Sequence, residues 1–294
     1  MASTPRQPAN AGPPRKKVPT EQDCPGQAAE AAVQRGMTAI TIGLRGLPRI
    51  SALVCTLLLL PVAATRAELH CPAVPALPAL HLPHLHAALQ RGIEGVIVAI
   101  GSSSTQGVMA SDPAHSYPAV LQAALARAMP HLHLAVLNRG IGGQDAPEEL
   151  ARLDADVIAV RPQLVIWQVG ANGALRNADP LAFRRTVAEG VARLHAAAID
   201  VVLMDNQHAP RVDATAEHAV LNEMLGDVAV ATGAGLFPRS RLMESWGEEG
   251  APPVEFVSTD GLHHNDRGYT CVARAMAQGI VTALHETRAL SASR

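Results

Sequence analysis

Two groups of polar residues in this chain are of the types that carry out hydrolytic chemistry. An apolar run ends in a Gly-Ser-Ser-Ser-Thr segment at residues 101–105, and far downstream Asp260 and His263 stand three positions apart. A serine hydroxyl becomes a nucleophile when an imidazole takes its proton, and a carboxylate at the second ring nitrogen fixes the required tautomer. We therefore predict that Ser103, His263 and Asp260 are the nucleophile, base and orienting acid of a serine hydrolase.

Two further segments offer groups that can stabilise an oxyanion. Gly143 ends the run Asn138–Gly143, and the missing side chain lets a backbone N–H approach a ligand closely. Asn172 follows the next apolar run, and its amide can donate a hydrogen bond. A tetrahedral intermediate needs donors of this kind for its charged oxygen. Gly143 and Asn172 are therefore candidate oxyanion donors.

The elements that must position these residues alternate between strand and helix patterns. Short apolar runs predict strands over residues 95–101, 134–137, 164–169, 201–204 and 235–237. Helical spacing predicts helices over residues 117–129, 147–160, 180–198, 215–231 and 266–285. This alternation predicts a three-layer α/β/α sandwich whose parallel sheet has flavodoxin-like order. The loops that follow the strands then meet at one edge of the sheet, where open α/β folds bind ligands.

Four segments, taken in order, resemble the SGNH hydrolases, also called the GDSL esterase/lipase family. The family's Gly-Asp-Ser-x-Thr-like, Asn-x-x-x-x-Gly, Gly-x-Asn-Asp and Asp-x-x-His blocks correspond to residues 101–105, 138–143, 170–173 and 260–263. Asn265 and the pair Gly268-Tyr269 also look like the family, and the similarity covers about residues 95–285. A subset of exported bacterial members looks similar in carrying a Gly-Ser-Ser-Ser-Thr first block.

The resemblance implies specific roles. Ser103 is the nucleophile, and Asp260 and His263 complete the triad. The Ser103 N–H, the Gly143 N–H and the Asn172 side chain form the oxyanion hole. It implies no metal and no organic cofactor.

The chain departs from the family pattern at two positions. Ser102 replaces the aspartate before the nucleophile, and Gly173 replaces the aspartate after the block-three asparagine. Neither position belongs to the triad, so activity is expected. The altered first block leaves Ser102 and Ser104 as alternative nucleophiles.

The N-terminal part divides by composition. Residues 1–36 are polar and proline-rich, which predicts a disordered or mis-assigned extension. Residues 37–67 combine a basic lead, a short apolar core and a small-x-small site, as in a secretory signal peptide, with an uncleaved membrane anchor as the alternative. Residues 68–92 form a lead-in to one hydrolase domain at 93–288, and 289–294 form a tail. An exported protein, periplasmic or secreted, is expected.

Two of the four cysteines follow the predicted signal peptide. These are Cys71 and Cys271. Because export favours oxidation, we predict that they form a disulfide that joins the mature N-terminus to the last helix. Two unpaired thiols are the alternative.

Other features exclude several classes of function. The formal net charge is −2 and no basic stripe occurs, which argues against a nucleic-acid partner. His81, His84 and His86 match no metal signature, so no metal site is expected. Asp205 and His208 follow the fourth predicted strand and are expected in a solvated loop.

The sequence thus predicts a serine esterase that hydrolyses carboxylic esters through an acyl-enzyme. O-acetyl groups on carbohydrate are the preferred substrate, and a membrane is contacted only through the N-terminal signal or anchor. Three alternatives remain: an O-acyltransferase on the same site, a non-catalytic carbohydrate-binding module of the same fold, and a nucleotide-binding protein. The last lacks a phosphate-cradling lysine motif.

Overall fold

The computed structural model describes residues 70–292, with side chains as far as residue 286. The predicted extension at 1–36 and the predicted signal peptide at 37–67 lie outside these residues, as do positions 293–294 of the predicted tail. Between residues 70 and 292, no helix combines the length and the apolar character that crossing a membrane requires.

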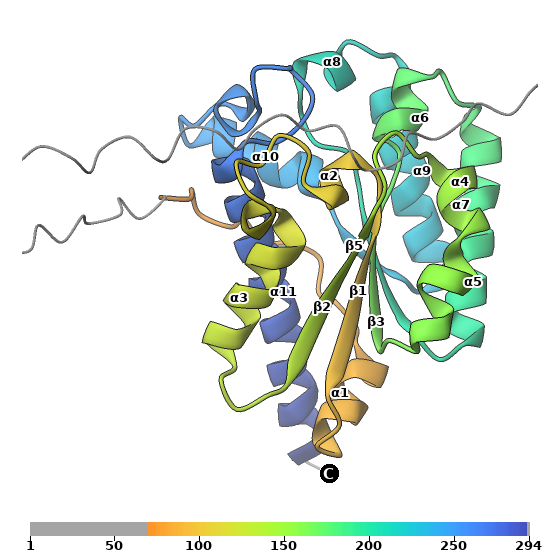
Figure 1. Ribbon diagram of the computed structural model, residues 1–294, viewed down its shortest axis with the longest axis vertical. Coiled ribbons are helices and arrows are strands. Elements are labelled where there is room, and N and C mark those ends of the chain that lie inside the picture. Colours follow the sequence, from red (N-terminus) through yellow and green to blue (C-terminus); the bar gives the residue numbers. More distant parts are fainter. Residues whose placement is uncertain (1–69, 293–294) are drawn as a thin grey trace, which may run out of the picture. The chain divides into compact units, whose positions relative to one another are not determined.

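Five parallel strands form one sheet in the order β2-β1-β3-β4-β5 (Figure 1). They are β1 (Gly95–Gly101), β2 (Leu134–Gly140), β3 (Leu164–Gln168), β4 (Asp200–Met204) and β5 (Gly235–Phe237). The central strands are buried along their length because helices cover both of their faces. The predicted flavodoxin-like order is confirmed.

The carboxyl ends of the central strands are level with one another. Gly101 pairs with Gly140 of β2 on one side and with Gln168 of β3 on the other, and Gln168 pairs with Met204 of β4. The loops that follow four of the five strands therefore begin at the same height along one edge, at the top of Figure 1.

One face of the sheet is covered by α1 (Pro83–Gln90), α3 (Tyr117–Ala128), α10 (Arg239–Glu248) and α11 (Asp266–Ala292) (Figure 1). Ile97 and Ala99 of β1 point into this layer. Trp246 is fully buried there, and its ring lies 4.5 Å from that of Phe256.

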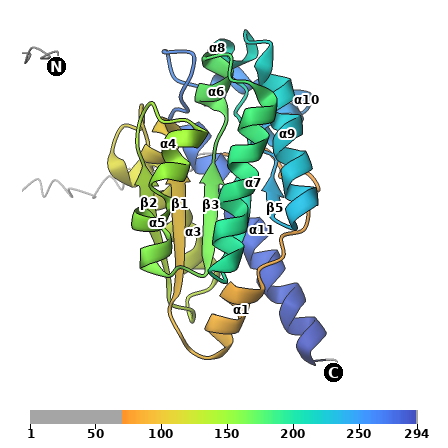
Figure 2. The same cartoon turned by 90° about the vertical axis from the view of Figure 1, so that its right-hand side faces the viewer.

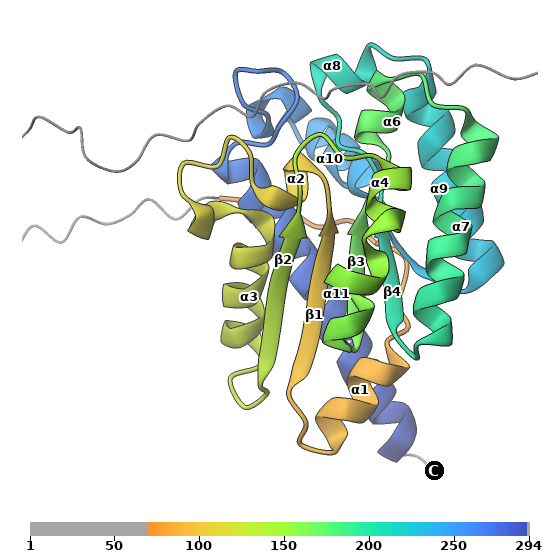
Figure 3. The same ribbon diagram turned by 45° about the vertical axis from the view of Figure 1, so that its right-hand side comes forward.

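The opposite face is covered by α4 (Ala146–Ala151), α5 (Leu153–Asp156), α7 (Pro180–Ala196) and α9 (Glu217–Thr232) (Figures 2 and 3). Val98 and Ile100 of β1 point into this second core. Trp167 is fully buried, and Gly190 of α7 lies so close above it that a Cβ there would be 2.4 Å from the indole ring. The predicted three-layer α/β/α sandwich is confirmed.

Short helices occupy the edge of the sheet where the strands end. α2 (Ser103–Gln106) follows β1, α6 (Ala171–Leu175) follows β3, and α8 (Pro210–Asp213) follows β4. Single 3₁₀ turns lie at Pro113–His115, Ile158–Val160 and Pro253–Phe256.

The continuous helix predicted over residues 147–160 is wrong. The segment divides into α4, α5 and the 3₁₀ turn, with the first break at Arg152. The Arg152 guanidinium donates to the Gly101 carbonyl (3.1 Å) and to Gln144 Oε1 (2.5 Å). The chain thus bends where this side chain reaches inward to the end of β1.

Besides the short helices α2, α6 and α8, the helices α1 and α10 were not predicted, and one helix is longer than predicted. α1 lies within the segment expected only as a lead-in, and α10 follows β5. α11 continues beyond the predicted end at residue 285 to Ala292, through part of the predicted tail. The helices α1 and α10 are recognised only from the core that they cover, because their sequences mix apolar residues with prolines, histidines or charges.

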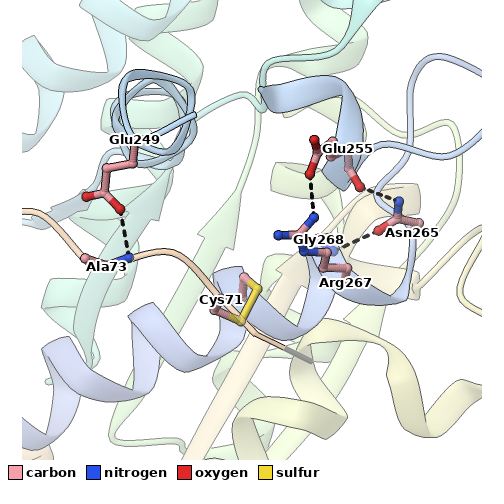
Figure 4. The surroundings of a disulfide bond; sticks show 8 residues. Cys71, Ala73, Glu249, Glu255, Asn265, Arg267 and Gly268 are labelled. Atoms are coloured by element: carbon pink, nitrogen blue, oxygen red, sulfur yellow. Dashed lines mark hydrogen bonds and ion pairs between the residues drawn. A yellow bond between two sulfur atoms is a disulfide. The ribbon is translucent and has the colours of Figure 1, made fainter. Parts of the chain in front are cut away.

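A disulfide joins Cys71 to Cys271 of α11 across a sequence separation of 200 residues. Figure 4 shows this bond beside the contact of the Ala73 N–H with Glu249 Oε2 at 3.2 Å. Leu80 and Leu82, further along the same segment, are buried in the first core. The N-terminal segment is therefore fastened to the face of the sheet that α11 covers.

Reduction of this disulfide is expected to lower the melting temperature, because the bond restricts the unfolded chain across a very long loop. Loss of such a bond typically costs about 2–5 kcal/mol. Thermal unfolding with and without dithiothreitol measures the effect. The double variant Cys71→Ser/Cys271→Ser should melt near the temperature of the reduced parent in both conditions and should not respond to the reductant. A parent protein that melts identically in both conditions contradicts the prediction.

Candidate active site

Among the three serines that follow β1, Ser103 is the accessible one. Ser102 and Ser104 retain 4% and 2% of their exposure, whereas Ser103 is half-buried at the start of α2. The Oγ atom of Ser103 lies 2.7 Å from Nε2 of His263. This geometry weighs against Ser102 and Ser104 as nucleophiles.

The second ring nitrogen of His263 faces Asp260. Nδ1 lies 2.5 Å from Asp260 Oδ2, and Asp260 Oδ1 accepts the N–H groups of Leu262 and His263, each at 3.0 Å. Partial burial alone would raise the pKa of Asp260, but these hydrogen bonds together hold that pKa below its usual value. An ionised Asp260 accepts the Nδ1 hydrogen, so Nε2 is free to accept the Ser103 hydroxyl hydrogen.

Buried polar groups hold the loop that carries Asp260 and His263. Gln207 Nε2 donates to the Leu262 carbonyl at 2.8 Å, and the fully buried Arg239 guanidinium donates to Gln207 Oε1 at 2.7 Å. Burial lowers the pKa of Arg239 to about 10, so the group stays charged at neutral pH. This chain of hydrogen bonds therefore fixes the position of the loop.

The same loop is fixed at its other end by the start of α11. Asn265 Oδ1 accepts the Gly268 N–H at 2.9 Å, which caps the helix, and Asn265 Nδ2 donates to the Glu255 carbonyl at 2.9 Å (Figure 4). Tyr269 donates its hydroxyl hydrogen to the Val108 carbonyl at 2.7 Å. The family-like residues after His263 thus anchor its loop.

The turn after β2 lies directly beside Ser103. The Gly142 N–H donates to Gln106 Oε1 of α2 at 2.9 Å, and a Cβ on Gly142 would be 3.8 Å from the Ser103 Cβ. A Cβ on Gly140 would lie 2.1 Å from the Gln106 nitrogen, so only glycine permits this approach. Gly143 has a φ of +80°, and a Cβ there would meet no heavy atom within 4 Å.

Asn172 links the third strand end to the same turn. Its Nδ2 donates to the Gln144 carbonyl at 2.7 Å, and Arg176 donates to the Gly143 carbonyl at 2.5 Å. An asparagine amide carries two N–H donors. The contact with Gln144 uses one of them and fixes the orientation of the Asn172 amide.

The structure accounts for Ser102 at a position where the family has aspartate. Gln168 at the end of β3 is buried, and its Oε1 accepts hydrogen bonds from the N–H and hydroxyl of Ser102, both at 3.3 Å. The Thr105 hydroxyl donates to the same oxygen at 3.1 Å. A neutral network under α2 therefore positions Ser103 from below.

A neighbouring carboxylate occupies the space around Gly173. A Cβ on Gly173 would lie 3.1 and 3.4 Å from the two carboxylate oxygens of Asp145. Asp145 is buried and caps α4 by accepting the Ala146 N–H, and burial raises its pKa above the usual value. The carboxylate that the family pattern places at position 173 thus has a counterpart that comes from the turn after β2.

A second buried acid, Glu149 of α4, lies behind that turn. Its Oε2 accepts the Trp167 indole hydrogen at 2.7 Å, and within residues 70–286 its Oε1 has no hydrogen-bond partner. Burial raises the pKa of Glu149 to about 8. At neutral pH this side chain is therefore mostly protonated.

The loop after β4 differs from the expected solvated loop. Asp205 is buried, and its carboxylate accepts the N–H and the hydroxyl of Ser240 at 3.0 and 2.5 Å. Burial raises the pKa of Asp205 to about 6.

His208 belongs to a cluster with Asp213 and His218. No pattern in the sequence indicated this cluster, because its members come from a loop and two helices.

The model of the non-GDSL lipase-like family matches residues 70–286. Among curated proteins, none matches the chain. Solved structures with a similar fold include TesA, with 22% identity over 63% of this chain and 97% of that chain and a TM-score of 0.54.

Two named esterases are similar in fold. Axe2, an acetylxylan esterase from Geobacillus stearothermophilus, has 19% identity over 63% of this chain and 94% of its own, with a TM-score of 0.55. CEX, a two-domain esterase active on acetylated mannans, has 22% identity over 70% of this chain and 55% of its own, with a TM-score of 0.60.

Fold and family together define an SGNH-type hydrolase that acts on ester bonds. The chain belongs to the non-GDSL lipase-like family, whose model covers nearly all of the described residues. The predicted resemblance to the SGNH hydrolases is thereby confirmed. The absence of a Gly-Asp-Ser-Leu sequence at residues 101–104 agrees with the name of the family.

The substitution Glu149→Gln is expected to stabilise the protein increasingly as the pH rises from 5 to 8. The folded state holds the Glu149 proton to a pH of about 8, whereas the unfolded chain releases it near its ordinary pKa, so parent stability falls across this interval. The slope approaches about 1.4 kcal/mol per pH unit for one proton.

Chemical unfolding of parent and variant at several pH values measures the difference. Glu189→Gln, on the exposed side of α7, is the matched control and should give no pH-dependent difference. A constant offset between parent and Glu149→Gln across the whole interval would show that Glu149 titrates alike in both states.

Proposed function

We propose that this protein is an exported serine esterase that cleaves carboxylic esters through an acyl-enzyme, with Ser103 as the nucleophile. The observation that carries the proposal is the continuous hydrogen-bonded series from Ser103 Oγ to His263 Nε2 (2.7 Å) and from His263 Nδ1 to Asp260 (2.5 Å). This series has the contacts that a nucleophile, a base and an orienting carboxylate need.

In the acylation step, Ser103 Oγ attacks the ester carbonyl while its proton passes to His263 Nε2. The resulting imidazolium is stabilised by Asp260, whose lowered pKa keeps it ionised. Negative charge on the former carbonyl oxygen is met by the N–H groups of Ser103 and Gly143 and by the Asn172 amide. Collapse of the intermediate breaks the ester bond, and the alcohol leaves with the proton from His263.

In the deacylation step, water replaces the alcohol. His263 takes one proton from the water, whose oxygen attacks the acyl carbon of the Ser103 ester. The second tetrahedral intermediate uses the same oxyanion donors. Its collapse returns the proton to Ser103 Oγ and releases the carboxylic acid.

O-acetyl groups on carbohydrate are the proposed substrate. The support is that two proteins with the same fold are named as acting on acetylated polysaccharides: Axe2 on acetylxylan and CEX on acetylated mannans. The acyltransferase and binding-module alternatives have no specific observation in their favour. The formed Ser103–His263 contact argues against a module that has lost its chemistry.

Export is supported by the Cys71–Cys271 disulfide, because such bonds persist in oxidising compartments. We propose that the segment at 37–67 directs the protein to the periplasm or the exterior. A fusion of residues 1–75 to a reporter that is active only after export tests this step; reporter activity that is absent with this fusion and present with a known signal peptide argues against it.

Replacement Ser103→Ala should lower kcat on p-nitrophenyl acetate by about 10⁴-fold or more, since the nucleophile is lost. Labelling by a fluorophosphonate probe should disappear as well. Ser102→Ala and Ser104→Ala, at the buried neighbouring positions, are the controls and should retain labelling. Retained labelling in Ser103→Ala, with loss in either control, would move the nucleophile to another serine.

Replacement Asn172→Ala should lower kcat by about 10²–10³-fold with a smaller change in KM, because an oxyanion donor acts mainly in the transition state. Steady-state kinetics on the same ester measures both constants. Asn177→Ala, an exposed asparagine just beyond α6, is the control and should behave as the parent. A rise in KM of the same size with kcat unchanged would assign Asn172 to substrate binding instead.

Acetylated xylan and mannan should release acetate with the parent protein and not with Ser103→Ala. Quantifying free acetate, and comparing p-nitrophenyl acetate with the octanoate ester, measures the preference. Faster turnover of the octanoate ester with no acetate from either polysaccharide would contradict the carbohydrate proposal. Transfer of acetyl to an added oligosaccharide in preference to water would favour the acyltransferase.

A further inference from the structure

A second cluster of side chains with metal-binding chemistry lies beside α8. It contains His208 from the loop after β4, Asp213 at the end of α8, and His218 in the first turn of α9. In Figures 1 and 2, α8 lies at the end of the sheet toward which the strands point. The cluster shares none of its members with the proposed triad or oxyanion hole.

The three side chains converge on one point. The Nδ1 atoms of His208 and His218 lie 3.0 and 2.9 Å from the same oxygen, Oδ1 of Asp213. All three ligand atoms lie within 4.8 Å of one another. In a tetrahedral zinc site, bonds of about 2.0–2.2 Å separate neighbouring ligand atoms by about 3.3 Å. Small outward shifts of the side chains therefore suffice to admit an ion.

The outer contact of His208 is an independent indication of a cation. Its second ring nitrogen, Nε2, lies 3.1 Å from Oε1 of Glu244 on α10. A neutral imidazole carries only one N–H, and metal-bound histidines commonly donate theirs to a carboxylate. With this hydrogen given to Glu244, the lone pair of Nδ1 faces the acceptor Oδ1 of Asp213. That contact is unfavourable unless a metal ion lies between them or the ring carries a second proton, and the zinc titration distinguishes these two cases.

Access to the cluster comes from the solvent side. The Asp213 and His208 side chains are 41% and 23% exposed, whereas His218 is 9% exposed and forms the inner wall. The His208 and His218 rings lie with their centroids 5.1 Å apart, inclined at 60°. An ion can therefore enter without opening the core, and a water molecule can complete its coordination.

We propose that His208, His218 and Asp213 bind one divalent transition-metal ion, with zinc as the preferred ion. Two imidazoles and one carboxylate are a donor set that suits zinc better than calcium or magnesium. The role we assign is structural. The Arg211 N–H of α8 donates to the Gly261 carbonyl at 3.0 Å, so an ion that fixes α8 also supports the loop of Asp260 and His263.

Isothermal titration with ZnCl₂ tests the site, using purified protein without a polyhistidine tag that has been treated with EDTA and dialysed. We expect one ion per chain and a rise in melting temperature that EDTA reverses. His208→Gln and Asp213→Asn should each weaken zinc binding by more than about tenfold, and Glu244→Gln by about tenfold. Circular dichroism establishes that the variants are folded.

Two controls separate this site from other histidines. His115→Ala removes a histidine that pairs with one carboxylate, Asp266 at 3.2 Å, and should bind zinc as the parent does. His263→Ala removes the proposed base and should also retain binding. Parent protein that binds no zinc would show a cluster held by a protonated histidine alone. That result overturns the proposal, as does binding that survives in folded Asp213→Asn and His208→Gln or disappears in His263→Ala.

Discussion

The hydrogen bond between Ser103 and His263 is the contact on which the rest of the site depends. It joins residues 160 positions apart at 2.7 Å. One partner is fixed because it begins a helix directly after β1, an inner strand of the sheet. The other lies in a loop with no regular structure of its own, so its position has to be imposed by its neighbours. Much of the buried polar structure at this end of the molecule does so.

Two hydrogen-bonded chains illustrate this arrangement. From Arg239 a path leads through Gln207 to the carbonyl of Leu262, next to His263. From Gln168 another path leads to Ser102, next to Ser103. A buried guanidinium is costly unless its donors are satisfied, and Arg239 also donates twice to the Asp205 carbonyl. These hydrogen bonds offset the free-energy cost of burying the polar groups, and they also fix the positions of the two reacting side chains.

The sequence predicted the parts that depend on local pattern. Continuous apolar runs predicted the central strands, and four short blocks predicted the residues that meet at the sheet edge. The end of β2 was underestimated because the polar residues Asn138 and Arg139 belong to an edge strand, where exposure is tolerated. Asp145 beside Gly173 could not be foreseen, since proximity across two loops leaves no trace in spacing. The same reason hid the His208 cluster, whose members meet only through the path of the chain around α8.

The predicted helix boundaries are wrong where the contacts of a single side chain outweigh the helical periodicity of the sequence. Residues 147–160 have helical spacing throughout, but the guanidinium of Arg152 finds acceptors at the end of β1 and beside it. Glu149, in the same segment, has the composition of an exposed helix start and is fully buried against Trp167. Both departures lie behind the turn that bears Gly143. Tertiary contacts near the proposed oxyanion donors thus outweighed local propensity.

The bond between Cys71 and Cys271 makes the intervening polypeptide a covalent ring, and Ser103 and His263 both lie on it. A protease that cuts one exposed loop between them would give two fragments that remain joined by the disulfide. One fragment would carry Ser103 and the other would carry His263. In surroundings rich in proteases, a single cut in such a loop would therefore not release either fragment.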